Sequence, residues 1–173
     1  MPDAPYRAAV LTVSDRGSRG ESVDTAGPVV ASILQGGGFT VVERAVVPDE
    51  PAEVASILRR WADEAGYDVV VTTGGTGLTP RDRTPEATAE VLDYRIPGME
   101  EAMRAVGITH TRMAMLSRGV VGVRGRTIII NVPGSERAAR ENLEVVLPVL
   151  VHACDSLEGD GGAAREAHEG EQR

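Results

Sequence analysis

A glycine-rich loop lies between a valine-rich segment and the start of a helix, in the sequence VVVTTGGTGLTPRDRTPEAT at residues 69–88. Glycines let backbone N–H groups approach an anion closely, and a helix N-terminus adds favourable partial positive charge. We therefore expect Gly74, Gly75, Thr76 and Gly77 to bind a phosphate. A tight turn that binds nothing is the alternative interpretation of the same glycines.

Asp82 follows this loop, and its carboxylate would repel a phosphate bound there. A divalent cation between the two anions removes the conflict, so we predict a metal at Asp82. Asp82 could instead cap the next helix, but Thr84, with Pro85 behind it, competes for that position. Glu86 falls in the first helical turn, where the helix dipole favours a carboxylate with or without a function.

The charge and the missing residue types exclude several classes of function. The net charge is −8, which argues against a general nucleic-acid binder. All 18 basic residues are arginine, so the glycine loop cannot be a Walker A motif and no lysine can act as a base. Cys154 is the single cysteine, which excludes an internal disulfide and a multi-cysteine metal site.

Nothing in the sequence indicates a membrane protein. No apolar run approaches the roughly 20 residues that cross a bilayer. The N-terminal MPDAPYRAAV lacks the basic and apolar regions of a signal peptide. We therefore expect a cytoplasmic protein that does not contact the membrane.

Apolar runs typical of buried strands alternate with amphipathic segments along the chain. This pattern predicts a three-layer α-β-α fold of the α/β class, with a mostly parallel sheet, helices on both faces and a small hairpin excursion. We expect strands at 7–14, 39–47, 67–73, 119–123 and 127–132, and helices at 25–35, 50–64, 84–92, 99–106 and 136–157. We expect one domain at residues 1–158, followed by a disordered, acidic, glycine-rich tail at 159–173.

Ligands of an open α/β sheet bind beyond the carboxyl ends of its strands. Polar residues follow four of the predicted strands, so we expect their loops to converge on one rim. Simpler roles remain open for several of them: Ser14 in a turn, Asp24 and Asp49 as helix caps, and Ser117 in a solvated loop. Ser135 is the expected N-cap of the last helix, after Pro133 and Gly134.

Several segments together resemble the molybdenum cofactor biosynthesis proteins of the Mog/MoaB type, a family that includes the gephyrin G domain. The resemblance extends from Arg7 to about Leu157. It implies a molybdopterin-binding fold and a homotrimer. Besides the glycine loop, its motifs are LTVSDRGSRGESVDTAGP at 11–28, VVPDE at 46–50, IPGMEEAMR at 96–104 and LSRGVVGVRGRTIIINVPGS at 116–135.

The resemblance implies an enzyme of molybdenum cofactor biosynthesis. Adenylyltransferases of this family pass AMP from Mg-ATP to the terminal phosphate of molybdopterin and release pyrophosphate. The Arg81-Asp82 pair before Thr84-Pro85-Glu86, and the acidic Asp49, resemble the adenylyltransferase version of these motifs. We therefore expect a molybdopterin adenylyltransferase with possible hand-over of its product to a molybdenum insertion protein.

The resemblance also implies roles for individual residues. Asp49 and Asp82 would hold Mg²⁺, directly or through water, and act as the catalytic residues. The loop from Gly74 to Gly77 would cradle phosphate. The residues expected to line molybdopterin and ATP are Ser14, Asp24, Thr84, Pro85, Glu86, Ser117, Pro133, Gly134 and Ser135.

Two other functions remain open. One is a non-catalytic carrier of the MoaB type that binds molybdopterin. The other is a nucleotide-binding regulator that has no link to molybdenum.

Overall fold

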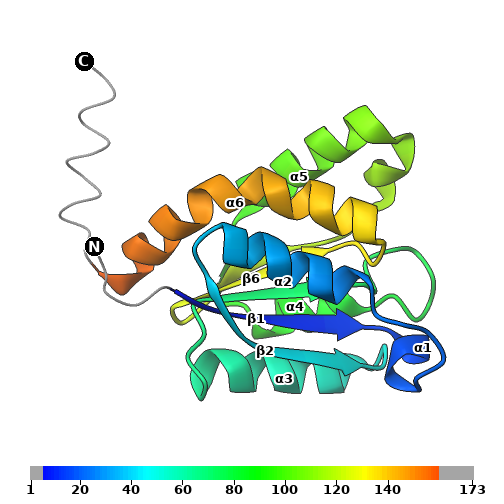
Figure 1. The fold of residues 1–173 in the computed structure, drawn as a ribbon, viewed down its shortest axis with the longest axis horizontal. Helices are drawn as coiled ribbons and strands as arrows, with labels where there is room; N and C mark the ends of the chain where they lie inside the picture. Colours follow the sequence, from blue (N-terminus) through cyan, green and yellow to red (C-terminus); the bar gives the residue numbers. More distant parts are fainter. Residues whose placement is uncertain (1–5, 160–173) are drawn as a thin grey trace.

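The computed structural model describes residues 6–159, and one six-stranded sheet forms its centre (Figure 1). The strand order is β2-β1-β3-β6-β5-β4. β2, β1, β3 and β6 run parallel to one another, whereas β5 is antiparallel to both β6 and β4. The strands are β1 (Arg7–Val13), β2 (Thr40–Val47), β3 (Val69–Thr73), β4 (Tyr94–Arg95), β5 (Val121–Arg124) and β6 (Thr127–Val132).

Helices cover both faces of the sheet, which confirms the predicted three-layer α-β-α fold. The helices are α1 (Asp15–Ser18), α2 (Ala26–Gly36), α3 (Pro51–Asp63), α4 (Thr84–Val91), α5 (Pro97–His110), the 3-10 helix η1 (Arg112–Leu116) and α6 (Glu136–Glu158). α2, α5 and α6 pack on one face, and α3 and α4 pack on the other (Figure 1).

Successive side chains of the central strands point to opposite faces of the sheet and form two hydrophobic cores. Val69 and Val71 of β3 point into the core under α2 and α6, while Val70 points into the core above α3 and α4. Ile128, Ile129 and Ile130 of β6 alternate in the same way. Strands covered on both faces are apolar at most positions, which explains the valine and isoleucine runs of the sequence.

Most predicted elements are confirmed within a few residues, and the β5–β6 pair is the predicted hairpin. Three short elements, α1, β4 and η1, were not predicted from the sequence. Gly159 ends α6 in the left-handed conformation, with φ 89°. The rest of the predicted tail lies outside the described residues. Within residues 6–159, no helix has the length and apolar character needed to span a bilayer.

Candidate functional site

A polar cavity of about 320 Å³ opens at the carboxyl ends of β1 and β3. The parallel strands therefore bring their following loops to one rim, as the alternating pattern predicts. Seven of the predicted site residues line this cavity: Ser14, Asp24, Asp49, Gly74, Gly75, Asp82 and Gly134.

The glycine turn at the floor of the cavity requires glycine for two reasons. Gly74 and Gly75 have φ angles of 101° and 66°, which side chains strongly disfavour. An added Cβ would also overlap the Val13 carbonyl at Gly74 and the Thr84 hydroxyl at Gly75. Because Gly74 and Gly75 have no side chain, a ligand in the cavity can approach their backbone atoms closely.

The backbone N–H groups of this turn are not all available to an anion. The Gly74 N–H donates to the Val132 carbonyl at 3.2 Å and extends the sheet by one hydrogen bond. Within residues 6–159, no protein acceptor engages the N–H groups of Gly75, Thr76 or Gly77. Consecutive unpaired N–H groups in a glycine turn are typical of anion-binding loops.

Asp49 does not cap α3, so that interpretation is wrong. Glu50 occupies the N-cap position, whereas the Asp49 carboxylate accepts the Asp15 N–H at 2.9 Å. Burial raises the pKa of Asp49, and the negative charges of Asp15 and Asp82 raise it further. The ionised form of Asp49 is therefore destabilised in this cavity, and a bound cation would stabilise it.

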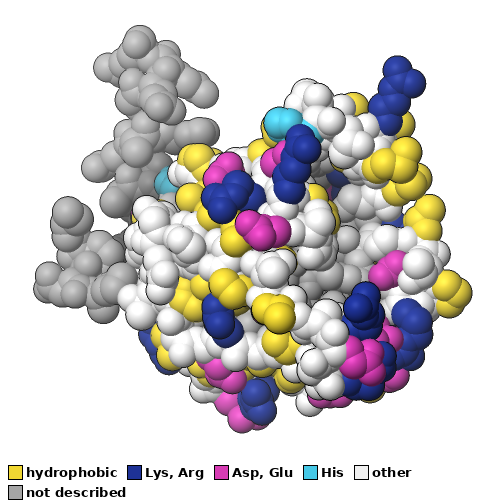
Figure 2. Space-filling view, turned by 45° about the vertical axis from the view of Figure 1, so that its right-hand side comes forward, with side chains coloured by type: hydrophobic (Ala, Val, Ile, Leu, Met, Phe, Trp, Pro, Cys, Tyr) yellow, Lys and Arg dark blue, Asp and Glu magenta, His cyan; other side chains and the backbone are white. Residues whose placement is uncertain are grey.

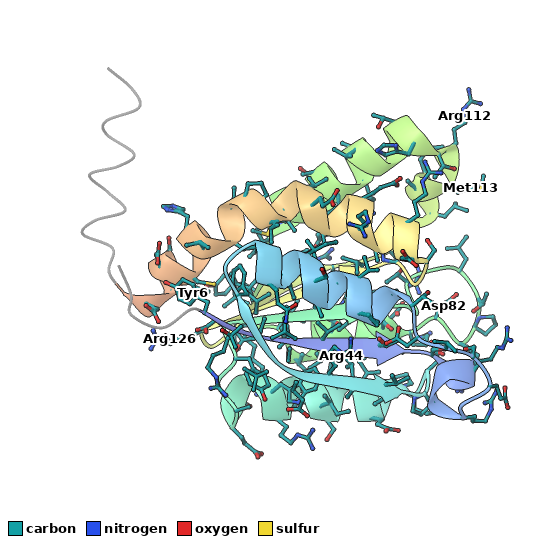
Figure 3. All side chains as sticks on the ribbon, viewed as in Figure 1. Tyr6, Arg44, Asp82, Arg112, Met113 and Arg126 are labelled. Carbon is teal, nitrogen blue, oxygen red and sulfur yellow. The ribbon has the colours of Figure 1, made fainter. Side chains whose placement is uncertain are left out.

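Asp82 lines the same cavity from the loop between β3 and α4, and it is labelled in Figure 3. Its Oδ2 accepts hydrogen bonds from the Thr79 N–H at 2.9 Å and the Thr79 hydroxyl at 2.7 Å. Asp82 therefore stabilises its own turn and does not cap α4.

Asp49 and Asp82, which both line the polar cavity, are the residues that could hold Mg²⁺. The described residues contain no cluster of three or more metal-binding side chains, so a closed protein cage is absent from this part of the chain. Mg²⁺ seldom uses such a cage, because it keeps several waters and binds one or two carboxylates plus substrate phosphates. The burial of Asp49 and its repulsion by Asp82 would be offset by a cation between the two carboxylates.

Asp24 forms part of the cavity wall between β1 and α2. Its Oδ2 accepts the Thr12 hydroxyl at 2.8 Å, and its Oδ1 accepts the Gly27 N–H at 2.9 Å. Thr25 is the N-cap of α2 by position but makes no capping bond with its side chain. Thr12, which also lines the cavity, was not among the predicted site residues. Its signal is a hydroxyl near the carboxyl end of an otherwise apolar strand.

A second hollow of about 310 Å³ lies beside the polar cavity and has a mostly apolar lining. Met103 of α5 and Met113 and Leu116 of η1 contribute that lining, and none of the three was among the predicted site residues. Their separation along the chain gives no signal of a shared surface. The predicted site residues that line this hollow are Thr76, Gly77, Ser117, Pro133 and Ser135.

The predicted residues thus divide between two neighbouring hollows. The glycine loop contributes to both, with Gly74 and Gly75 in the polar cavity and Thr76 and Gly77 in the apolar hollow. At this end of the molecule, charged side chains gather at the lower right of Figure 2 and apolar side chains at the upper right. A ligand that reaches both hollows would need a charged part and an apolar part.

Thr84, Pro85 and Glu86 line neither hollow. The prediction that Thr84 caps α4 is wrong, because α4 begins at Thr84 and Arg83 is its N-cap. The Thr84 N–H donates to the Gly75 carbonyl at 3.1 Å, and its buried hydroxyl has no hydrogen-bond partner. Thr84 therefore lies directly behind the glycine turn.

The hydroxyls of Ser14 and Ser135 each cap a helix at the rim. Ser14 Oγ accepts the Gly17 N–H at 3.0 Å at the start of α1. Ser135 Oγ accepts the Ala138 N–H at 3.3 Å, which confirms the predicted N-cap of α6. Each hydroxyl still has a proton to donate to a ligand.

Arg81 links the glycine loop to the two neighbouring loops. Its guanidinium donates to both carboxylate oxygens of Asp15, at 3.0 and 2.8 Å, and lies 2.9 Å from the Glu50 carboxylate. The Arg81 hydrogen bonds hold the pKa of Asp15 below its usual value, and the Asp49 N–H adds to that effect. Three separate loops are thereby tied together beside the polar cavity.

Comparison with known proteins identifies relatives along most of the chain. The family described as "Probable molybdopterin binding domain" matches residues 9–152. The chain is 38% identical over 153 residues to the molybdopterin adenylyltransferase of Helicobacter pylori (strain J99), and the match covers 87% of each protein. A solved structure of the molybdopterin biosynthesis enzyme MoaB from Thermus thermophilus has a TM-score of 0.84 and 56% identity, covering 89% of this chain and 97% of that one.

A longer relative shares the same region. The chain is 41% identical over 157 residues to the molybdenum cofactor biosynthesis bifunctional protein of Chlorobaculum tepidum. That match covers 91% of this chain and 50% of the relative, so this chain spans about half the length of that protein.

Proposed function

Because this chain belongs to the family of probable molybdopterin binding domains, we propose that it is a molybdopterin adenylyltransferase. In the proposed reaction an oxygen of the terminal phosphate of molybdopterin attacks the α-phosphorus of ATP. The bond from that phosphorus to the bridging oxygen breaks, and pyrophosphate leaves. The product is adenylylated molybdopterin.

The chief obstacle to this reaction is electrostatic, since two phosphates must meet. Positioning and charge neutralisation supply most of the catalysis in such transfers. The free N–H groups of Gly75, Thr76 and Gly77 support the proposal that this turn cradles a phosphate. No lysine is available, so backbone amides, arginines and a metal must offset the negative charge.

Asp49 and Asp82 would hold Mg²⁺ in this proposal. When bound, the metal would neutralise charge on ATP oxygens and on the departing pyrophosphate. The two aspartates would orient the nucleotide phosphates toward the glycine turn. Asp24, whose carboxylate is held by the Thr12 hydroxyl and the Gly27 N–H, would accept a hydrogen bond from a substrate at the opposite wall of the cavity.

The apolar hollow would take a flat ring of one of the two substrates. Met103, Met113 and Leu116 offer an apolar surface, and the hydroxyls of Ser117 and Ser135 offer polar contacts. Molybdopterin and ATP each combine a ring system with phosphate. The adjacency of a polar cavity and an apolar hollow across the glycine loop is the observation that carries the proposal.

The proposal includes an assembly and a location. The resemblance to the Mog/MoaB type supports a homotrimer, hand-over of the product to a molybdenum insertion protein, and work in the cytoplasm. Light scattering on the purified protein tests the trimer, since one chain has a mass of 18.2 kDa.

Incubation of the protein with molybdopterin and Mg-ATP tests the proposed reaction. Pyrophosphate and adenylylated molybdopterin should form in equal amounts, and Asp82→Asn should lose both products while still binding molybdopterin. A wild-type protein that binds molybdopterin but never releases pyrophosphate would instead be a non-catalytic carrier. No affinity for molybdopterin would leave the nucleotide-binding regulator.

A further inference from the structure

One arginine outside both hollows holds the loop that carries Asp82. The Arg118 side chain donates from Nε to the Gly77 carbonyl at 2.8 Å and from Nη2 to the Asp82 carbonyl at 2.5 Å. Its Nη1 donates to the Glu86 carboxylate in the first turn of α4. The Arg118 backbone N–H also donates to the Thr76 carbonyl at 3.1 Å.

These contacts span the whole loop. The loop runs from Gly77 to Asp82, so the Arg118 guanidinium joins both of its ends and ties them to Glu86 of α4. Arg118 lies in the connection between η1 and β5, far from the loop in sequence. It therefore anchors the loop to a separate part of the fold.

A second arginine, Arg81, ties the tip of the loop to Asp15 and Glu50 on neighbouring loops. Leu78, Thr79, Pro80 and Arg81 are all exposed, and 64% of the Leu78 surface is accessible. Within the loop, the Asp82 N–H donates to the Thr79 carbonyl at 3.0 Å, and Thr79 donates twice to the Asp82 carboxylate. Such local bonds shape the turn but do not fix its place against the sheet, so Arg118 is the contact that ties both ends of the loop to α4.

The chemistry of arginine suits this task and that of lysine does not. A guanidinium presents five N–H donors in a rigid plane, and here three of its nitrogens serve three separate acceptors. A lysine at the same place would keep the charge beside Glu86. Its single nitrogen could not reach two carbonyls and a carboxylate in the same arrangement.

We infer that Arg118 is a positioning residue, whose guanidinium holds the Gly77–Asp82 loop so that the Asp82 carboxylate faces the polar cavity. Arg118 does not line that cavity and would not touch either substrate there. Its effect passes through the backbone of the loop. The importance of this position for catalysis rests on the proposed adenylyl transfer, whereas the anchoring of the loop does not.

Hydrogen exchange and Mg²⁺ titration on three variants test the inference. Arg118→Gln removes the guanidinium, and Arg118→Lys keeps only the charge. Arg112→Gln is the control, because Arg112 is an exposed arginine of η1 that points away from the molecule (Figure 3). Circular dichroism establishes that each variant is folded.

Exchange of the amides in residues 78–83 should accelerate about tenfold or more in Arg118→Gln and in Arg118→Lys, because charge-assisted hydrogen bonds to the loop are lost. The Mg²⁺ concentration for half-maximal AMP transfer should rise about 10–100-fold, the range typical of lost supporting contacts around a metal ligand. The KM for molybdopterin should change much less. Arg112→Gln should match wild type in every measurement.

Wild-type exchange in Arg118→Lys would overturn the inference, since charge alone would then hold the loop. Faster exchange with an unchanged Mg²⁺ requirement would overturn the link to Asp82. If Arg118→Gln fails to fold, Arg118→Lys and Glu86→Gln, which weakens one of the three contacts, carry the same test. A wild-type protein without transferase activity would end the proposed function, while the exchange data would still decide whether Arg118 anchors the loop.

Discussion

Asp15 and Asp49 exchange hydrogen bonds across the ends of β1 and β2. The Asp15 N–H donates to Asp49 Oδ2 at 2.9 Å, and the Asp49 N–H donates to Asp15 Oδ1 at 3.0 Å. Two carboxylates are thereby held close together at the rim of the polar cavity. Arg81 pairs with Asp15 but not directly with Asp49, so the two carboxylates differ in their electrostatic environment.

The raised pKa of Asp49 predicts that this residue lowers stability at neutral pH. An ordinary aspartate has a pKa of about 3.9. Between that value and the higher folded-state pKa, the folded chain binds more protons than the unfolded chain, so stability falls as pH rises through this window. Asp49→Asn should therefore raise the thermal unfolding midpoint at pH 7. It should also slow AMP transfer by about 10²–10³, as for other lost electrostatic groups.

Asp63→Asn is the control of opposite sign. The Arg124 hydrogen bonds lower the pKa of Asp63, so its ionised form favours the folded state. That variant should lower the midpoint at pH 7 and leave transfer unchanged. A lower midpoint for Asp49→Asn, measured by calorimetry without Mg²⁺, would contradict the account of Asp49.

Loss of Arg81 should remove the acid sensitivity that Asp15 gives the protein. Arg81 lowers the pKa of Asp15, so ionised Asp15 contributes stability that is present above its ordinary pKa and is lost as pH falls through the folded-state pKa. Arg81→Gln brings the folded-state pKa back toward the ordinary value and so removes this contribution. The unfolding midpoint of Arg81→Gln should lie below that of wild type at pH 7, and the two curves should converge as the pH falls below about 4. Parallel curves from pH 7 to pH 3 would show that Arg81 does not control Asp15.

Gly75 should tolerate alanine much less than Gly66 does. Both have a positive φ, 66° at Gly75 and 62° at Gly66, which costs an alanine about 1–2 kcal/mol. A Cβ at Gly66 meets nothing within 4 Å, whereas at Gly75 it would overlap the Thr84 hydroxyl and approach Asp49 Oδ1 at 3.1 Å. In urea unfolding, Gly66→Ala should lower the free energy of unfolding only by that backbone cost. Gly75→Ala should lower the free energy of unfolding by more and should also abolish AMP transfer. Equal decreases in the two variants would contradict the close packing behind the turn.

Asn131 of β6 should be important for stability although it lines neither hollow. Its amide donates to the Thr72 and Thr88 hydroxyls at 2.9 and 3.0 Å and accepts the Val120 N–H at 3.2 Å, all in buried surroundings. Asn131→Ala leaves these groups unpaired, and each unsatisfied buried group costs about 1–3 kcal/mol. We expect a loss of about 3 kcal/mol or more in urea unfolding. Asn142→Ala, which removes one bond to Ala138 in the same helix, should cost clearly less.

The sequence predicted the location of the site better than its shape. Alternating strands and helices place the carboxyl ends of β1, β2, β3 and β6 at one rim, because parallel strands all point the same way. That topology is enough to bring Asp24, Asp49 and Asp82 to one cavity. Local sequence patterns determine the elements, and the elements determine the rim.

The contacts within the rim depend on packing that no local pattern encodes. The exchange between Asp15 and Asp49 depends on the register of β1 against β2, which pairs Val13 with Val47. The apolar hollow depends on how η1 folds back against α5, which in turn packs on α6. Thr84 was predicted as a cap, but it is the first residue of α4, and its N–H donates to the Gly75 carbonyl.

Labelled ATP gives the most direct test of the proposed transfer. The protein is mixed with molybdopterin, Mg²⁺ and ATP labelled either at the α-phosphate or at the γ-phosphate. We expect the α label to move to the pterin and the γ label to pyrophosphate, with neither movement in Asp82→Asn. A γ label on the pterin, or bound pterin with both labels remaining in ATP, would contradict adenylyl transfer by this chain.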